Sequence, residues 1–198
     1  MTRKYELKRR AEHQERTRQR IVEAALGLHG TVGPAKTTIS AIAERAGVRR
    51  MTVYRHFPDE RALFEACTTH GYAAYPPPDP ALWKEIADPE ERLRRGLGEL
   101  YAYYRLTGSM WVKFLRDADE IPVLAELGVA PYLGYLEMVR EVLAVGWGVR
   151  GKRRERLVAA LGHALELQSW ISLTERQGLD DEQAVNFMVR TVRCATRD

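Results

Sequence analysis

Residues 49–56 read Arg-Arg-Met-Thr-Val-Tyr-Arg-His, a short stretch rich in side chains that recognise nucleic acids. An arginine guanidinium pairs bidentately with the O6 and N7 acceptors of guanine, and a methyl group of threonine or methionine can contact the methyl of thymine. The hydroxyls of Thr38 and Tyr54 and the imidazole of His56 suit phosphate oxygens. The chemistry that these residue types favour is therefore the binding of bases and phosphates.

Two short helices must position these side chains. The Thr37-Thr38 pair predicts the start of a helix that runs to about Ala46, Gly47 predicts its end, and residues 49–55 form the next helix. Two helices joined by a turn that contains glycine are a helix-turn-helix arrangement, which can place the N-terminal end of the second helix in a major groove. Small and apolar residues suit a close crossing of these helices: Ile42, Ala43, Ala46, Gly47, Val48 and Val53.

The rest of the chain has the pattern of an all-α protein with about nine helices. Apolar residues recur at helical spacing over 6–28, and Asp59 predicts the start of a helix that ends near residue 71, with Leu63, Phe64 and Cys67 inward. The proline-rich run 75–80 predicts a boundary between domains 1–72 and 73–198. In the second domain we expect helices over about 88–106, 109–118, 131–146, 152–176 and 181–195, a break at Thr107-Gly108, a short helix between Pro122 and Pro131, and a capping box at 180–183.

Charge is distributed unevenly along the 198 residues, whose formal net charge is +4. Residues 1–70 contain 14 Lys and Arg against 8 Asp and Glu, whereas residues 71–198 contain 17 against 19. The basic first third predicts a module for nucleic acid or another anionic surface, although a solvated basic surface would give the same count.

An N-terminal arm, residues 1–15, and the positions just after it contribute many of these cations. The arm could follow phosphates or enter an adjacent minor groove, and the alternative is a solvated helix extension balanced by Glu6, Glu12 and Glu15. The basic residues concerned are Arg3, Lys4, Lys8, Arg9, Arg10, Arg16, Arg18 and Arg20.

At the helix-turn-helix the sequence resembles the TetR family of one-component bacterial transcription regulators. The resemblance runs over about residues 20–64 and rests on Ile21–Ala25, Thr37-Thr38, Ile42–Val48, Thr52–Phe57 and Leu63. It implies a homodimeric repressor that binds double-stranded DNA at a palindromic operator, with an N-terminal three-helix DNA-binding domain and a C-terminal helical domain for ligand binding and dimerisation. A dimer also follows from the binding mode, because one short helix reads few bases and a two-fold dimer doubles the contact.

By this resemblance Thr38 and Tyr54, with His56 as a third candidate, contact the phosphate backbone. One position departs from the family, which commonly has a lysine where this sequence has Glu60; either Arg61 takes over that phosphate contact or the contact is lost. The DNA-binding candidates are Thr38, Arg49, Arg50, Met51, Thr52, Tyr54, Arg55, His56, Arg61, Lys8, Arg9 and Arg10.

The C-terminal two-thirds is rich in aromatic residues, most of which suit core packing. Several could line a pocket for a small-molecule effector of apolar or aromatic character, as the resemblance implies. The pocket candidates are Tyr104, Trp111, Phe114, Tyr135, Met138, His163 and Trp170. The resemblance also implies that the last two helices pair across a two-fold axis, although their apolar stripes could instead form intrachain core. The candidate dimer contacts are Leu161, Leu165, Gln168, Ser172, Val185, Met188 and Val192.

Three further functions leave weaker traces in the sequence. Gly146–Gly151 fits G-x-G-x-x-G after the strand-like segment 141–145, which would suit a dinucleotide-binding enzyme, but a parallel sheet needs several strands and a glycine-rich break between helices fits better. The basic first third would also suit a ligand-independent architectural DNA-binding dimer. A protein that binds a membrane surface through its basic arm is the third of these functions.

No catalytic residue, metal site or cofactor is predicted. The sequence has no G-x-S-x-G, H-E-x-x-H or C-x-x-C motif, and Cys67 with His70 supplies only two possible ligands. Two cysteines in total suit a reducing compartment, and there is neither an apolar run of about 18 residues nor an N-terminal signal sequence. We therefore expect a cytoplasmic protein with no membrane partner.

Overall fold

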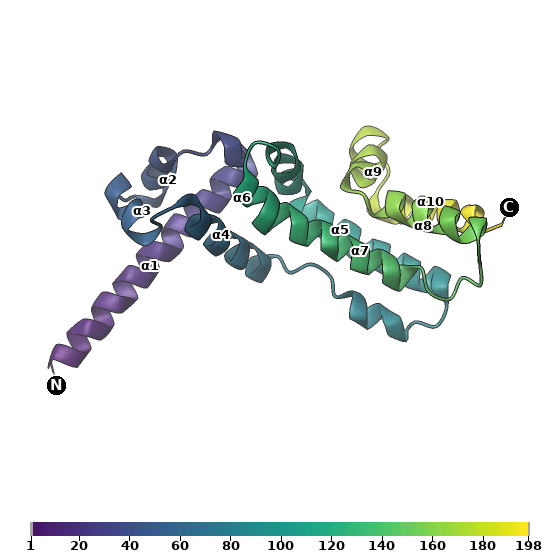
Figure 1. The fold of residues 1–198 in the computed structure, drawn as a ribbon, viewed down its shortest axis with the longest axis horizontal. Coiled ribbons are helices and arrows are strands. Elements are labelled where there is room, and N and C mark those ends of the chain that lie inside the picture. The colour runs from purple at the N-terminus through teal and green to yellow at the C-terminus, as the bar shows by residue number, and fades with distance from the viewer. Residues whose placement is uncertain (1, 198) are drawn as a thin grey trace. The chain divides into compact units, whose positions relative to one another are not determined.

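The computed structural model describes residues 2–197, with side chains from residue 5 onward, and in this range it contains helices and no strand. The predicted all-α class is confirmed. The α-helices are α1 Thr2–Thr31, α2 Ile39–Ala46, α3 Arg50–His56, α4 Glu60–Ala74, α5 Pro89–Asp117, α6 Pro122–Leu124, α7 Ala130–Leu143, α8 Lys152–Leu165, α9 Leu167–Ile171 and α10 Asp181–Ala195 (Figure 1). Short 3₁₀ turns cover Pro34–Lys36 and Pro80–Glu85, and π-helical turns cover Ala125–Val129 and Ser172–Arg176.

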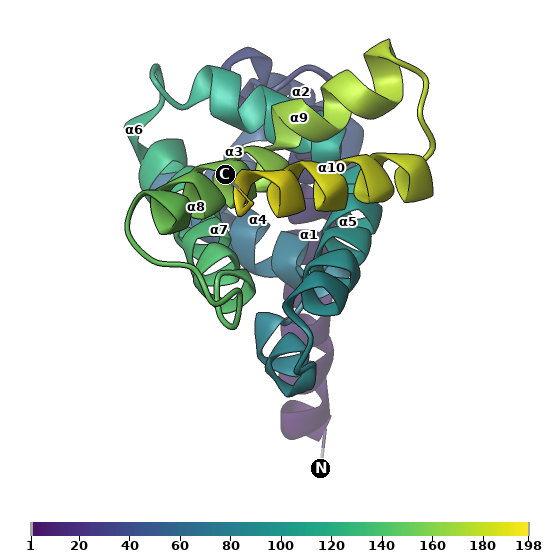
Figure 2. The same ribbon diagram turned by 90° about the vertical axis from the view of Figure 1, so that its right-hand side faces the viewer.

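The chain divides into two compact units. The first contains Met1–Ala74 and Met110–Ala130, and the second contains Tyr75–Ser109 and Pro131–Asp198. In the first unit α2 and α4 pack on α1 around buried apolar side chains. In the second unit α8 and α10 lie side by side (Figure 2).

Side-chain caps start several helices where the sequence predicts them. Thr38 caps α2, the Asp59 carboxylate accepts from the Ala62 N–H (2.8 Å), and Asp180 with Gln183 forms a capping box on α10. Each cap gives a hydrogen-bond partner to an N–H group that the first helical turn leaves free.

The expected break at Thr107-Gly108 is wrong, because α5 continues through it to Asp117. The buried Thr107 hydroxyl donates to the Tyr103 carbonyl one turn earlier (2.8 Å). A Cβ at Gly108 would lie 3.2 Å from the Trp170 ring and 3.3 Å from Leu167. The glycine therefore lets these two side chains pack closely against α5.

The expected single helix over 152–176 is also wrong, because it is interrupted at Glu166, whose ψ is 132°. Two carbonyls at the end of α8 there accept hydrogen bonds from buried tyrosines of α5. The Tyr101 hydroxyl donates to the Ala164 carbonyl (2.9 Å) and the Tyr104 hydroxyl to the Leu165 carbonyl (2.6 Å). The interruption thus satisfies polar groups that would otherwise be buried without partners.

The context needed for a dinucleotide-binding turn is not present around Gly146–Gly151. Residues 141–143, expected as strand-like, are the last turn of α7. Gly146, Gly148 and Gly151 all have positive φ (85°, 67° and 55°) in the connection between α7 and α8. The segment is a glycine-rich link between helices, as the favoured interpretation of the sequence states.

The segment Met110–Ala130 is tied to the N-terminal helices of the first unit. The buried Asp117 carboxylate accepts from the Ala35 N–H (3.0 Å), and a Cβ at Gly33 would lie 2.6 Å from the same carboxylate. The hydrogen bond from Arg116 lowers the pKa of Asp117. Further along, the buried His29 ring stacks on Phe64 (5.3 Å between centroids) and meets the edge of Phe114 (6.1 Å).

Candidate nucleic-acid interface

The helix-turn-helix of the first unit has the predicted local geometry. The Thr38 hydroxyl accepts from the Ala41 N–H (3.1 Å) at the start of α2, and Gly47 takes the left-handed conformation (φ 64°) at its end. Val53 of α3 is fully buried against this crossing. The two helices are therefore held at a fixed crossing by a cap, a turn and a packed side chain.

Two arginines of α1 brace this arrangement. The Arg20 guanidinium donates to the Ala46 carbonyl (2.8 Å), which is an unpaired end carbonyl of α2. The Arg18 guanidinium lies over the Phe57 ring, 5.0 Å from its centroid, just after α3. The sequence places Arg18 and Arg20 among the basic residues that could contact phosphates. Their contacts with α2 and Phe57 depend on which side of α1 they lie, and only that position could have indicated a structural role.

The outer face of α3 is exposed and uncommitted. Met51 is 74% exposed and Tyr54 is 42% exposed, while Thr52 is half-buried. Arg49, Arg50 and Arg55 are exposed, and none of the three forms an ion pair with another residue of the part of the chain that the structure describes. Donors and methyl groups thus stand free along one helix face, as contact with base edges and phosphates requires.

His56 is a weaker phosphate candidate. It is half-buried, and its Nε2 atom is buried without a hydrogen-bond partner among the described residues. Burial, then the charges of Arg55 and Arg18, lower its pKa, and Glu15 opposes them. Both causes favour the neutral imidazole over the charged one, which weakens its attraction to a phosphate.

The arm is a continuous helical extension in α1. Lys8, Arg9 and Arg10 are exposed, and Arg3 and Lys4 lie outside the described side chains. Glu12 lies between two cations, 3.9 Å from Lys8 and 4.0 Å from Arg16. Such exposed pairs are weak, so these cations stay available to an anion.

Arg61 is already engaged in an ion pair. Its guanidinium holds both carboxylate oxygens of Glu126 (3.0 and 2.6 Å), which lowers the pKa of Glu126. Glu60 beside it is exposed. Arg61 can contact a phosphate only when it leaves Glu126, and its phosphate contact stays a prediction.

The seven pocket candidates are divided between the two units, with Trp111 and Phe114 in the first and the others in the second. In the second unit Tyr104 is fully buried, donates to Leu165 and accepts from the Tyr132 hydroxyl (3.2 Å). Trp170 and Tyr135 also donate to partners in that unit: Trp170 to Asp181 (3.0 Å) and Tyr135 to the Pro78 carbonyl (2.9 Å). Trp111 and Phe114 pack on each other in the first unit, and Met138 is 49% exposed.

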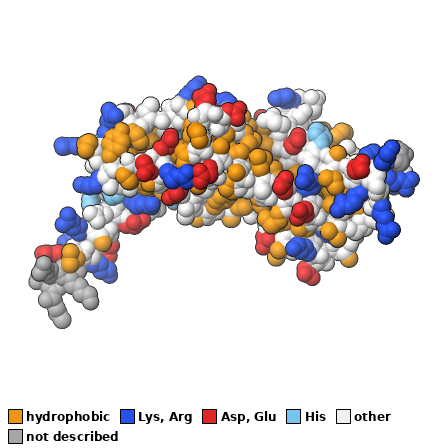
Figure 3. Space-filling view, in the orientation of Figure 1, with side chains coloured by type: hydrophobic (Ala, Val, Ile, Leu, Met, Phe, Trp, Pro, Cys, Tyr) orange, Lys and Arg blue, Asp and Glu red, His pale blue; other side chains and the backbone are white. Residues whose placement is uncertain are grey.

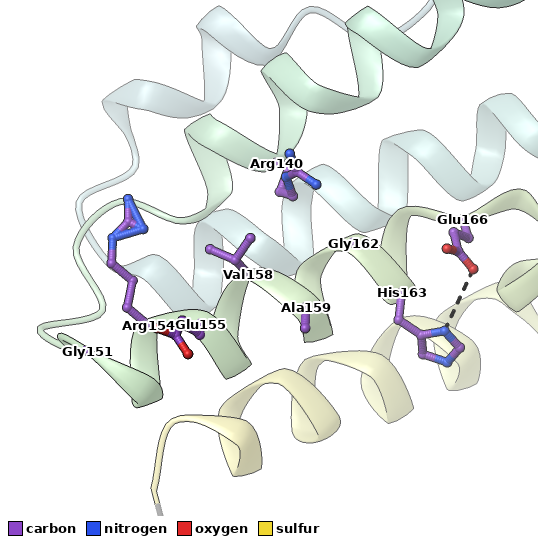
Figure 4. Close-up of a pocket in the computed structure, with 9 residues that line it drawn as sticks. All are labelled: Arg140, Gly151, Arg154, Glu155, Val158, Ala159, Gly162, His163 and Glu166. Carbon is purple, nitrogen blue, oxygen red and sulfur yellow. Dashed lines mark ion pairs between the residues drawn. The ribbon is translucent and has the colours of Figure 1, made fainter.

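His163 lines a surface hollow of about 680 Å³ between α7 and α8 (Figure 4). Arg140 contributes from α7, and the other lining residues lie along α8 or at its two ends (Figure 4). The His163 Nδ1 lies 3.9 Å from the Glu166 carboxylate at one end of the hollow. The lining residues are Arg140, Gly151, Arg154, Glu155, Val158, Ala159, Gly162, His163 and Glu166.

Most candidate dimer contacts lie inside the second unit, where they form intrachain core. Five are buried within a single chain: Leu161, Leu165, Val185, Met188 and Val192. Gln168 is exposed and Ser172 is half-buried. The apolar stripes of α8 and α10 therefore face each other, which is the intrachain alternative of the sequence analysis. The exposed sides of the two helices carry Ala159 and Phe187.

Loss of the Thr38 cap is expected to lower the stability of the helix-turn-helix unit. Thr38→Ala will lower the free energy of unfolding by about 1 kcal/mol, because the Ala41 N–H loses its side-chain acceptor. Thr38→Ser keeps the hydroxyl and should stay within a few tenths of a kcal/mol of the parent. Urea denaturation of the three proteins measures the difference, and equal midpoints for Ala and Ser would contradict the capping role.

Comparisons with known proteins agree with this geometry. Residues 21–67 match the family model for bacterial regulatory proteins of the tetR family. The transcriptional repressor NicS of Pseudomonas putida is 30% identical over 116 residues, which are 59% of this chain and 50% of NicS. The regulator AcrR of Shigella flexneri is 44% identical over 57 residues, or 29% of this chain and 26% of AcrR. These matches span half of the length of such relatives or less.

Solved structures extend the likeness in fold to nearly the whole chain. AibR, solved with isovaleryl coenzyme A and operator DNA, has a TM-score of 0.63 and 21% identity over 88% of this chain and 97% of AibR. The fatty acid degradation regulator FadR of Bacillus halodurans has a TM-score of 0.61 and 17% identity over 91% and 96% of the two chains. Residues 21–67, which contain the helix-turn-helix, are therefore similar to the tetR family of bacterial regulatory proteins, and the likeness of the rest of the chain is one of fold.

Proposed function

We propose that this protein is a homodimeric transcriptional regulator that represses genes by binding a palindromic DNA operator. The observation that carries the proposal is the face of α3, where Arg49, Arg50 and Tyr54 stand exposed on a braced helix-turn-helix. NicS, which matches this segment, is named a repressor, and AibR was solved with operator DNA. No helix among residues 2–197 is long and apolar enough to cross a membrane.

The proposed dimer uses the exposed sides of α8 and α10, because their inner sides are occupied within the chain. Ala159 and Gly162 leave room for a close helix on α8, and Phe187 of α10 is 52% exposed. A partner copy would cover this aromatic side chain, and two-fold pairing would present two α3 helices to two half-sites.

A small-molecule effector would act by shifting the population of DNA-competent dimers. AibR was solved with isovaleryl coenzyme A, which supports an acyl-thioester or a similar ligand here. Two contacts of the segment Met110–Ala130 reach the helix-turn-helix unit: Asp117 with Ala35 ahead of α2, and Glu126 with Arg61 of α4. The chain before and after this segment belongs to the second unit. A conformational change in the second unit can therefore reach the helix-turn-helix unit through this segment.

The first experiment is selection of bound duplexes from a random DNA library, followed by a salt titration on the selected sequence. The proposal expects an inverted repeat bound with nanomolar affinity. Weak binding without enrichment, and with a steep dependence on salt, would instead leave a non-specific architectural role. Loss of the operator complex on addition of acyl-coenzyme A esters tests the effector, and no change with any of them would contradict that ligand class.

Arg49→Ala should lower affinity for the selected operator by tenfold or more, which corresponds to about 1–3 kcal/mol, and should affect a random duplex much less. The reason is that a guanidinium on a base edge carries sequence information. Lys8→Ala is the matched control, expected to weaken both duplexes alike and to reduce the salt slope by about 1. Fluorescence anisotropy measures both, and equal effects of the two substitutions on both duplexes would contradict the assigned roles.

A further inference from the structure

Four basic residues stand close together where α8 begins: Arg150, Lys152, Arg153 and Arg154, called here the α8 basic cluster. All four are exposed, and within the described part of the chain none of them forms an ion pair. Glu155 is the one acidic residue of this turn. The cluster thus carries a positive charge that its own surroundings leave largely uncompensated.

The end of α10 adds to this surface. The Arg156 guanidinium donates to the Ala195 carbonyl (3.3 Å), which holds the end of α10 beside the start of α8. Arg197 is exposed there, whereas Arg193 lies 3.5 Å from the Glu90 carboxylate. Figure 3 shows Lys and Arg side chains gathered at this end of the second unit.

The types of residue indicate what this surface fits. Arginine predominates over lysine, and its planar guanidinium binds phosphate oxygens in a bidentate manner. The exposed positions of α8 are charged, polar or small, so the helix lacks the large apolar face that a membrane-surface helix inserts.

We propose that the α8 basic cluster binds the phosphate backbone of a second DNA duplex, without sequence preference, while the helix-turn-helix holds the operator. The proposal rests on the proposed function for its first duplex. Repeating phosphates at fixed spacing match a row of guanidinium groups, and each contact releases a counterion. A protein with both surfaces would join two DNA segments.

A bridging assay tests the proposal on the full chain. Operator duplex is fixed on beads, protein is added, and capture of a fluorescent duplex without operator sequence is measured over a range of salt. The pair Arg153→Glu and Arg154→Glu should lower this capture about tenfold and reduce its salt slope by about 2, while retention on the operator stays unchanged. Acidic residues in the first turn favour a helix, so the circular dichroism of this variant should match the parent.

The matched control is the pair Lys84→Glu and Arg176→Glu, an equal charge change at exposed sites of the same unit, which should leave capture unchanged. Equal capture by the parent and the α8 variant would overturn the proposal. So would a loss of sedimentation with phosphatidylglycerol vesicles that leaves duplex capture intact, because the cluster would then face lipid. If the operator beads retain no protein, the proposed function is contradicted and the α8 proposal is not. The α8 proposal then still predicts that the α8 variant binds the fluorescent duplex more weakly than the parent.

Discussion

Replacing Arg92 with methionine will lower the free energy of unfolding by about 3 kcal/mol. The Arg92 side chain is buried, and its guanidinium donates to carbonyls from two parts of the second unit: Ile86 (2.7 and 2.9 Å) in the loop before α5, and Val145 (2.8 Å) after α7. Methionine fills much of the same space and offers no donor, so these carbonyls lose the hydrogen bonds from the guanidinium.

Urea denaturation monitored by tryptophan fluorescence measures this change. Arg95→Met on the same helix is the control, because Arg95 is exposed and its ion pair with Glu99 lies at the surface, so its loss should cost less than about 1 kcal/mol. Arg92→Lys keeps the charge with fewer donors and should fall between the two. An Arg92→Met protein as stable as Arg95→Met would show that the guanidinium does not hold these segments together.

The stability of the first unit will depend on pH through His29. Burial lowers the pKa of His29 from 6.5 to about 4, and its Nδ1 has no partner among the described residues. The unfolded chain therefore binds a proton on this residue at a higher pH than the folded chain does. Stability is complete above pH 6.5, falls as the pH drops toward 4, and the loss reaches about 3 kcal/mol, since one pKa unit corresponds to about 1.4 kcal/mol.

Other groups titrate in this window, so the test is a difference between two proteins. His29→Leu keeps an apolar contact with Phe64 and cannot be protonated. The gap in unfolding free energy between this variant and the parent should change by about 3 kcal/mol between pH 7 and pH 4, in favour of the variant at low pH. A gap that does not vary with pH would mean that His29 is protonated inside the folded chain.

Local chemistry could be predicted from the sequence, whereas long-range partners could not. Thr38, Asp59 and Asp180 cap their helices where expected, because a cap is decided by residues three positions apart. The local pattern at Thr107-Gly108 predicts the end of a helix, and that prediction is wrong. The glycine there packs closely against Trp170, a residue far along the chain that no local pattern could indicate.

The candidate sites divide in the same way. Exposure of Arg49 and Tyr54 follows from the period of one short helix, so the face of α3 could be predicted. Leu161 and Leu165 also lie on the apolar face of a helix. Such a face does not indicate whether the residues that pack against it belong to the same chain or to a second copy. In this structure α10 covers this face. The pairing of Arg61 with Glu126 spans 65 positions and left no local pattern.

The contact of Asp117 with Ala35 bears on how such regulators can be recombined. A fragment cut at the proline-rich run after α4 would lack Asp117, Phe114 and Glu126. The Ala35 N–H would then lose its acceptor, His29 would lose a ring contact, and Arg61 would lose its ion-pair partner. Transplanting this DNA-reading module onto another effector domain therefore requires two pieces of chain, residues 1–74 and 110–130, moved as one. A chimera joined at a single crossover would inherit the reading helix without the residues that support it.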